Sequence, residues 1–477
     1  DEFDYTTSVT NPDDTVSKET GSITVTVSPE TEKGPSGTFV LSKLKAFPSA
    51  FGAGELVSGG RGGKIYEVTN LNDSGAGSLR EALNASGPRI VLIKVEGRLK
   101  LTSDLNLSGV NQGDVSIIGQ TAPGYGLEVT GQRFTFYNNG NIILRHLTVR
   151  NGNDVGFGSF GVRESQSGKG AYVDHSTFTY GMYQSLDFIG RYNDQNWTAA
   201  NNVIAESLEG HNTGSIMGTS GNGSVVTGNY TIARNMWYNV THRTPNMSGK
   251  GGKFEVYNNY IVNYQTRLSR TNGSIKVDWF NNYVEAGNRS KSGTPVNKAA
   301  YDPDFKTYTG GNYVEGIDES SKDNQTGLWV NYKSNVEGAD NAPINHNHYV
   351  SSRQNNFPEP ADGIWNSLDV PEKVTSTVGH TRGTNSNGEP GGSTEKVFRT
   401  SSQWTYPSRN SGFEPFKDSD SDGMADTFED KHGLDKNNPD DGLGTKKDWD
   451  FGTFKVVNNA GYHNREIYWA YLANDFE

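Results

Sequence analysis

The sequence predicts an all-β protein in which short strands wind into a parallel β-helix, a solenoid of stacked coils. Short β-branched or aromatic runs, punctuated by Gly and Asn, begin at residues 114, 141, 171, 201, 234, 257, 280 and 311, a spacing of 23 to 33 residues. Recurrence at this spacing is typical of stacked repeats, and the runs lack the 3.6-residue pattern of helices. A β-sandwich is the alternative, although its strands usually recur about every 8 to 12 residues.

Asparagines recur within these runs, as in NNVIAES, YNNYIVNY and FNNYVEAG. Asn tolerates left-handed backbone angles at a turn, and its amide can bond to the coil above or below. We therefore expect the asparagines at the corners of the coils.

Composition divides the chain into three parts. Residues 1–44 are rich in Thr, Ser and Glu, with one alternating run, GSITVTVSP, that could be a strand, so we expect a spacer or edge segment. Residues 45–400 hold the repeats, and residues 401–477 form a different C-terminal segment. One helix is expected at 78–85, where Ser78 and Glu81 have capping-box spacing, and it would close the N-terminal end of the solenoid.

Charge and cysteine content exclude several classes of function. The chain has 477 residues, a formal net charge of -12 and no Cys. We therefore expect no general affinity for nucleic acid or anionic membrane, no disulfide and no thiolate chemistry. There is no apolar run of about 18 residues that would span a membrane. The chain begins at Asp1 without a signal-like segment, as a processed protein would. We expect a monomer secreted by bacterial-type export.

The C-terminal segment contains an acidic loop with the spacing of an EF-hand-like calcium loop. Such a loop supplies oxygen ligands from positions 1, 3, 5, 7, 9 and 12, with Gly at position 6. Here these positions are Asp418, Asp420, Asp422, Met424 through its carbonyl, Asp426 and Glu429, with Gly423 at the bend. Without a second loop of this kind, we expect one Ca²⁺ with a structural role. The alternative is a solvated acidic loop.

A basic stretch stands out in this acidic chain. Between residues 231 and 276, seven Lys or Arg accompany a single acid, Glu255. The seven are Arg234, Arg243, Lys250, Lys253, Arg267, Arg270 and Lys276. Lining one face of a solenoid, they would suit a chain of carboxylates, although at least half could simply point to solvent on different faces.

Several stretches resemble the pectate lyase group, polysaccharide lyase family 1. They are AFPSAFGAGELVSGGRGGKIYEVTNLNDSGAGSLREAL, IIGQTAPGYGL, YVDHSTFTYG, HRTPNMSGKGGKFEVYNNYI and, in the tail, DSDSDGMADTFEDKHGL. The likeness spans roughly residues 45–290 and the tail, whereas residues 295–400 match no family. It implies a right-handed parallel β-helix that uses Ca²⁺ and cleaves an acidic polysaccharide, such as polygalacturonate, by β-elimination.

The resemblance also implies roles for individual residues. Arg243, in HRTP, corresponds to the base that removes the C5 proton of the uronate. A guanidinium serves as a base only where burial and neighbouring cations favour its neutral form. The second arginine and the lysine usual in the family fall near Ser248 and Thr213. The candidate substrate-binding cations are Lys250, Lys253, His211, Arg267 and Arg270.

For a catalytic calcium, the resemblance implies Asp174, in VDHS, and Asp187, in YGMYQSLDF. Tyr183 and Gln184 stand where an acid is usual, and two carboxylates make a weaker site because affinity falls with ligand charge. Asp194, Glu206 or Glu209 could compensate. Alternatively, Asp174 and His175 are a hydrogen-bonded pair at a strand end, without a metal.

Two other functions remain open. A glycoside hydrolase would need two carboxyl groups flanking the scissile bond, and the adjacent aspartates, Asp13 with Asp14 and Asp440 with Asp441, lie outside the repeats. A carbohydrate-binding β-helix without catalysis is the other alternative, motivated by Tyr183 and Gln184.

Overall fold

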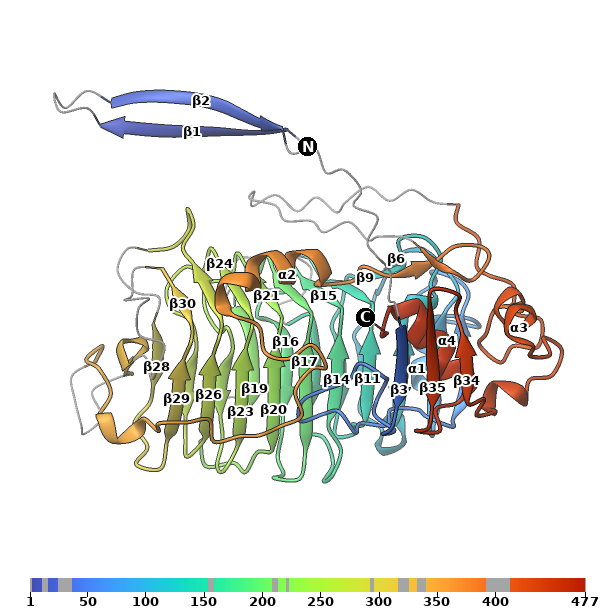
Figure 1. The fold of residues 1–477 in the computed structure, drawn as a ribbon. Helices are drawn as coiled ribbons and strands as arrows, with labels where there is room; N and C mark the ends of the chain where they lie inside the picture. The colour runs from blue at the N-terminus through green and yellow to red at the C-terminus, as the bar shows by residue number, and fades with distance from the viewer. Residues whose placement is uncertain are drawn as a thin grey trace.

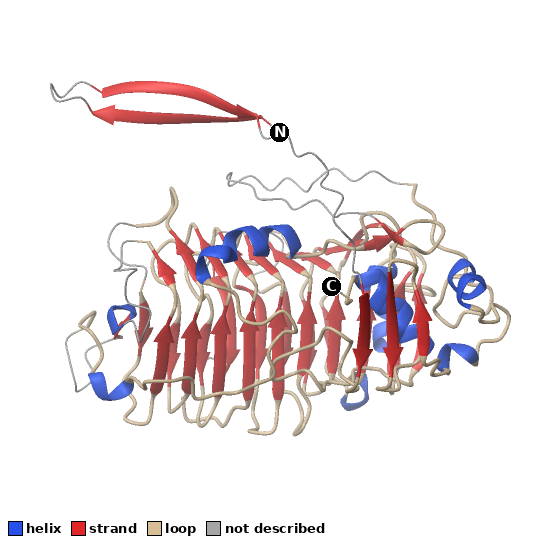
Figure 2. Ribbon diagram, in the orientation of Figure 1, coloured by secondary structure: helices blue, strands red, loops and turns tan. Residues whose placement is uncertain are grey.

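The computed structural model describes residues 2–10, 16–24, 37–152, 158–207, 213–219, 223–291, 296–315, 326–332, 340–391 and 412–476. Strands dominate these residues and helices are few (Figure 2). At the N-terminus, β1 (Glu2–Thr10) pairs with β2 (Val16–Thr24) as an antiparallel hairpin. The strand expected in GSITVTVSP coincides with β2 as far as residue 24, and its remainder lies outside the described residues.

Three parallel sheets wind around a common core for about nine turns, which confirms the predicted β-solenoid (Figure 1). The first sheet contains β7 (Leu105–Leu107), β10 (Phe134–Tyr137), β13 (Phe160–Arg163), β16 (Gln184–Ile189), β19 (Thr213–Gly218), β22 (Asn246–Ser248), β25 (Arg270–Asn272), β28 (Asn297–Ala299) and β31 (Trp329–Asn331). The second contains β4 (Lys64–Val68), β5 (Arg89–Ile93), β8 (Val115–Ile118), β11 (Ile142–Arg145), β14 (Ala171–Asp174), β17 (Asn196–Ala200), β20 (Asn229–Ala233), β23 (Lys253–Tyr257), β26 (Lys276–Phe280) and β29 (Lys306–Gly310). The third contains β6 (Gly97–Lys100), β9 (Leu127–Thr130), β12 (Thr148–Arg150), β15 (Thr177–Thr179), β18 (Val203–Ala205), β21 (Met236–Tyr238), β24 (Tyr260–Val262), β27 (Tyr283–Glu285) and β30 (Tyr313–Val314).

The core runs along the inside of the coils because alternate residues of each strand point inward. Parallel in-register pairing places similar side chains above one another. Trp197, Tyr230 and Phe254 stack in this way, with ring centroids 5.8 and 4.6 Å apart. The remaining alternate residues point outward, so each sheet presents a face on which functional side chains can stand.

An asparagine ladder forms the corner between the second and third sheets, as the sequence predicts. The backbone N–H of Asn202 donates to Oδ1 of Asn235 at 3.0 Å, and the same contact links Asn235 to Asn259 at 3.0 Å and Asn259 to Asn282 at 3.1 Å. The residue before each ladder position has a positive φ, for example 55° at Asn201. The ladder satisfies corner backbone groups that would otherwise be buried without partners.

Helix α1 (Leu79–Asn84) is the helix expected at 78–85. The hydroxyl of Ser78 accepts a hydrogen bond from the N–H of Glu81 at 3.2 Å, while the Glu81 carboxylate accepts one from Gly77 at 2.7 Å. Leu79 and Leu83 are fully buried in the main core. The helix therefore covers the first coils.

The last coil strand in the described residues is β31, and the chain then returns along the outside of the solenoid. This return segment, residues 340–391, crosses the second sheet, where Arg353 pairs with Glu255 at 3.0 Å. It next places α2 (Val370–Thr377) over the third sheet (Figure 1). It reaches the early coils at β32 (Gly383–Thr384), where the N–H of Thr384 donates to Ala122 O at 2.8 Å, and ends in β33 (Pro390–Gly391). The return segment thus connects late coils to early ones.

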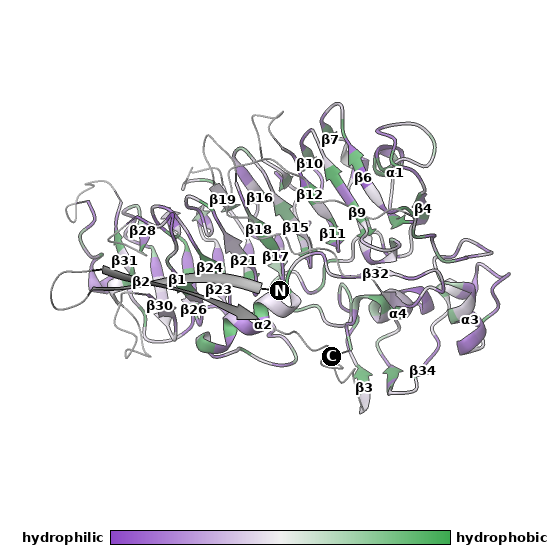
Figure 3. Ribbon diagram, turned by 90° about the horizontal axis from the view of Figure 1, so that it is seen from above, coloured by the Kyte–Doolittle hydropathy of each residue, from purple (hydrophilic) through white to green (hydrophobic). Residues whose placement is uncertain are grey.

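The C-terminal segment packs against the early coils and includes α3 (Asp426–His432), β34 (Asp448–Asp450), β35 (Phe454–Asn458) and α4 (Asn464–Ala473). β3 (Gly37–Leu41) forms the edge of its small sheet by pairing with β35. Ile90 and Leu92 share one apolar cluster with Met424 and Trp469. Figure 3 shows this segment beside the solenoid. Within the described residues, every helix is too short or too polar to cross a membrane.

Candidate active site and cation site

Arg243 lies just before β22, in the segment that enters the first sheet. Its backbone is fixed on both sides, since its N–H donates to Leu268 O at 3.0 Å and its carbonyl accepts from Ser215 N at 2.8 Å. Its φ is 70°, a left-handed conformation that is unusual for a residue with a side chain. Coil-to-coil contacts therefore hold this residue in a locally costly conformation.

Arg243 lies close to two further arginines, since the charge of Arg270 acts on Arg243 and the charge of Arg243 acts on Arg267. Burial, followed by the charges of Arg270 and Arg243, lowers the pKa of Arg267 to about 9. Burial also lowers the pKa of Arg243, with Arg270 adding to the effect and Asp187 opposing it. Among the described residues, Nε of Arg243 and Nη1 of Arg267 are buried without a hydrogen-bond partner. The structure thus brings together three predicted site residues, Arg243, Arg267 and Arg270.

Asp187 is the carboxylate that faces this arginine group. Its neighbours Leu186 and Phe188 lie in the core, so Asp187 points outward from β16. It pairs with Arg163 of β13, and its Oδ1 accepts from Ile216 N at 3.0 Å. Burial is the main reason that the pKa of Asp187 is raised. The sequence did not single out Arg163, whose position one coil before Asp187 becomes clear only from the register.

Asp174 occupies a different face of the solenoid. Its neighbour Val173 is in the core, so Asp174 points outward from the second sheet. Asp187 belongs to the first sheet, and the predicted pair of calcium ligands is therefore not brought together. The resemblance implied both residues, and the sequence did not show that consecutive strands of a coil belong to different sheets.

A buried polar network surrounds Asp174. Its Oδ2 accepts from Nε of Arg145 at 3.0 Å and lies 2.9 Å from Nδ1 of His175, and its Oδ1 accepts from Asn201 at 2.9 Å. Arg145 also pairs with Asp475 at 2.7 Å. Burial alone would raise the pKa of Asp174, but His175 and Arg145 lower it to about 2. This arrangement matches the alternative of a hydrogen-bonded pair at a strand end.

The remaining predicted cations lie apart from Arg243 or outside the described residues. Lys250 is exposed in the turn after β22, and Lys253 is exposed at the start of β23 in the second sheet. His211 lies outside the described residues. Ser248 and Thr213, near the positions where the family usually has an arginine and a lysine, are uncharged, and their hydroxyls donate to Thr219 O at 2.5 Å and Tyr183 O at 3.0 Å.

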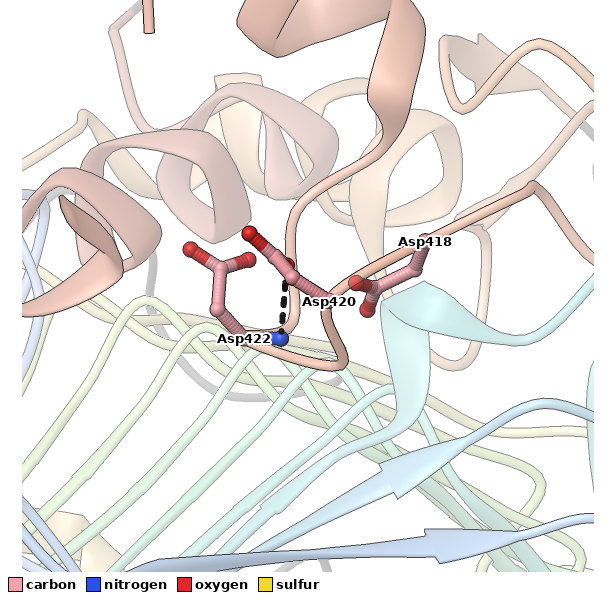
Figure 4. Close-up of side chains that lie close together, drawn as sticks. All are labelled: Asp418, Asp420 and Asp422. Carbon is pink, nitrogen blue, oxygen red and sulfur yellow. Dashed lines mark hydrogen bonds between the residues drawn. The ribbon is translucent and has the colours of Figure 1, made fainter. Parts of the chain in front are cut away.

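The acidic loop of the C-terminal segment brings several carboxylates close together. Among the described residues, most of these carboxylates have no ion pair with a lysine or arginine. Asp418, Asp420 and Asp422 place carboxylate oxygens within 4.8 Å of one another (Figure 4). Asp422 does the same with Glu429 and Asp441. Asp441 was not expected from the loop spacing, because it follows the loop in the chain and reaches it only through the fold.

Two other predicted positions of the loop are placed differently. The carboxylate of Asp426 accepts hydrogen bonds from Ser419 N at 2.7 Å and from Lys417 at 2.8 Å. It belongs to neither of the two groups of carboxylates described above. Met424 is buried, and its N–H donates to Asp422 at 2.8 Å.

Several oxygens of this acidic cluster are buried without a hydrogen-bond partner among the described residues. They include both carboxylate oxygens of Glu429, which is fully buried, and Oδ2 of Asp422, which is 2% exposed. Burial and the neighbouring carboxylates raise the pKa of Glu429 to about 9 and that of Asp422 to about 7. Unsatisfied, converging carboxylate oxygens are the donor set that fits a calcium ion.

Comparison with known sequences gives relatives in fungi. No family model matches the chain. "Probable pectate lyase C" of Aspergillus fumigatus is 32% identical over 280 residues, which cover 58% of this chain and 61% of that protein. The protein of the same name from Aspergillus flavus is 34% identical over 252 residues, covering 52% and 55%. The chain thus spans less than two thirds of the length of these relatives. The relatives are fungal proteins, so secretion by bacterial-type export stays a prediction.

Matches among solved structures have lower sequence identity. A Bacillus subtilis pectate lyase has a TM-score of 0.47 and 15% identity, covering 71% of this chain and 98% of that chain. The Bacillus sp. N165 pectate lyase Bsp165PelA, solved in complex with trigalacturonate, has a TM-score of 0.43 and 16% identity, covering 67% and 94%. The likeness of the chain to pectate lyases therefore rests on the sequence matches and not on these structures. Over more than half of its length, the chain is similar in sequence to proteins named as pectate lyases.

Proposed function

We propose that this protein is a secreted, monomeric polysaccharide lyase that cleaves a uronate polymer, such as polygalacturonate, by β-elimination. The observation that carries the proposal is the group of Arg243, Arg267 and Arg270, in which buried guanidinium nitrogens have no hydrogen-bond partner among the described residues. The names of the fungal relatives favour the same activity.

In this reaction the base takes the C5 proton of a uronate residue. The electrons of the C–H bond form a C4–C5 double bond, and the C4–O4 bond breaks to release the rest of the polymer, whose oxygen receives a proton from water. We assign proton removal to Arg243, because burial and Arg270 favour its neutral form. Arg267 and Arg270 would hold the substrate carboxylates.

We further propose that Ca²⁺ binds on this face through Asp187, together with carboxylates of the substrate. Asp187 would hold the ion beside the uronate, and the bound ion would neutralise the carboxylate next to C5 and so acidify the C5 proton. A single protein carboxylate makes a weak site, so we expect binding only in the presence of substrate. Asp174 is assigned a structural role, because Arg145, His175 and Asn201 already engage it.

The acidic loop is proposed to bind a second, structural Ca²⁺. Its ligands would be Asp418, Asp420, Asp422, Glu429 and Asp441, with the Met424 carbonyl in addition and Asp426 in support. The loop contacts the early coils, since Lys94 lies 3.5 Å from Asp418 and Met424 shares an apolar cluster with Ile90 and Leu92 of β5. The ion would thus fasten the C-terminal segment, 401–477, to the solenoid, which we propose to be right-handed and to lie within residues 45–400.

The proposed activity is tested by incubating the protein with polygalacturonate, with and without added Ca²⁺. Elimination gives an unsaturated sugar that absorbs ultraviolet light, hydrolysis gives reducing ends without this absorbance, and a binding protein gives neither. Calcium-dependent absorbance is the expected result. Reducing ends without absorbance would instead favour a hydrolase, although Glu255 and Asp278, which are adjacent in register on the second sheet, lie beneath the return segment.

A further inference from the structure

A row of lysines runs across three neighbouring strands of the second sheet. Lys253, Lys276 and Lys306 are the first residues of β23, β26 and β29 and are direct register partners. Adjacent strands are about 4.8 Å apart, so the row repeats a positive charge at short, regular intervals. Lys253 and Lys276 are exposed, and Lys306 is half-buried.

The fold does not account for this row. Like charges directly opposite on neighbouring strands are destabilising. Within the described part of the chain, the ammonium groups of Lys253 and Lys276 have no ion pair or hydrogen bond, while Lys306 donates to Asn347 O at 3.0 Å. In a chain with a net charge of -12, three cations gathered on one line need another explanation.

The nearest acids on the same strands are already occupied. Glu255 pairs with Arg353 of the return segment at 3.0 Å. Asp278 accepts the backbone N–H groups of Gln354 and Asn355 at 2.9 and 2.7 Å. The return segment therefore engages these carboxylates, and the row of lysines stays positive.

We propose that Lys253, Lys276 and Lys306 form an accessory site that holds a uronate polymer while another part of the same polymer lies over Arg243. Regularly spaced carboxylates complement regularly spaced ammonium groups. The turns at 249–252 and 273–275 are short, so the row borders the first sheet. The identity of the polymer rests on the proposed function, whereas the row as a polyanion site does not.

The test measures binding without cleavage, in an Arg243→Ala background. Lys253→Gln/Lys276→Gln/Lys306→Gln is compared with Lys64→Gln/Lys447→Gln/Lys455→Gln, which removes the same charge from exposed lysines elsewhere. Affinity for polygalacturonate should be roughly 3- to 100-fold lower in the Lys253→Gln/Lys276→Gln/Lys306→Gln variant than in the control, because three solvent-exposed ion pairs with the polymer are lost. The affinity for trigalacturonate should change little, and the affinity for a fully methyl-esterified polymer should not change. The affinity for polygalacturonate should also depend less on salt concentration in this variant.

Equal polymer affinity in the two triple variants would overturn the proposal and leave the row a solvated surface. Lys253→Arg/Lys276→Arg/Lys306→Arg should retain polymer affinity, and loss in this variant would also count against a charge-based site. If the wild-type protein binds polymer through the row yet releases no unsaturated product, the lyase proposal fails and the accessory site stands.

Discussion

Asp187 and Arg243 lie near one another on the outward face of the first sheet, and the carboxylate opposes the loss of the arginine's proton. Burial lowers the pKa of Arg243, whereas the charge of Asp187 raises it. Arg163 already pairs with Asp187. A cation bound at Asp187 would offset the same charge, so calcium binding and deprotonation of Arg243 favour one another in the proposed mechanism.

Replacing Asp187 should therefore change the calcium requirement of the enzyme. In Asp187→Asn, the Ca²⁺ concentration for half-maximal activity should rise on the order of tenfold or more, because the proposed site loses its protein carboxylate. Calcium titration of the initial rate measures this change.

Asp174→Asn is the matched control. It removes one acceptor from the buried network of Arg145, so it should lower stability by about 1 to 3 kcal/mol and leave the calcium requirement unchanged. A raised calcium requirement in Asp174→Asn alone would instead favour Asp174 as the ligand.

The acidic loop should control stability rather than turnover. Asp420→Asn/Asp422→Asn should abolish the rise in melting temperature that Ca²⁺ gives the wild type, because binding to the native state stabilises by mass action. Initial rates well below the melting temperature should be retained. The exposed pair Asp430→Asn/Asp448→Asn is the control, and loss of turnover without loss of stability would contradict a structural ion.

Asp441→Asn tests the part of this site that the loop spacing did not predict. Its carboxylate meets Asp422 and Glu429. The variant should lose most of the calcium-induced stabilisation, and thermal melts at matched calcium concentrations measure it. Unchanged stabilisation would place Asp441 outside the ligand set.

The return segment should give stability a pH dependence through Glu255. Burial raises its pKa to about 7, above the usual glutamate pKa of 4.5. The native state therefore binds more protons than the unfolded state between these values, and the stability present below pH 4.5 is lost as pH rises through about 7. Glu255→Gln should melt at a higher temperature than the wild type at pH above about 8 and show less advantage near pH 5. An advantage that does not vary with pH would exclude this cause.

The repeat spacing, the corner asparagines and Ser78 were sufficient to predict the solenoid and its capping helix, because each reflects an interaction within one coil or between adjacent coils. Which sheet a residue belongs to was harder to predict. Asp174 and Asp187 are 13 residues apart yet stand on different sheets, since one coil contributes a strand to each.

Contacts between residues that are distant in sequence could not be predicted either. Arg163 meets Asp187 through the register of neighbouring coils, and Asp441 meets Asp422 through the fold of the C-terminal segment. The return segment contains no repeat, so no sequence pattern predicted the contact between Arg353 and Glu255. The basic stretch, by contrast, did contain Arg243, Arg267 and Arg270, but it did not distinguish them from Lys253, which belongs to the second sheet.

The proposed mechanism depends most directly on Arg243 as the base, and the kinetics of Arg243→Ala on polygalacturonate test this role. kcat should fall roughly 10²- to 10⁴-fold with KM little changed, the usual worth of a positioned general base. Arg243→Lys should recover little, because an ammonium group differs in shape and hydration, and Arg80→Ala, in α1, should behave as the wild type. An unchanged kcat with a raised KM in Arg243→Ala would make the residue a substrate clamp and contradict its role as the base.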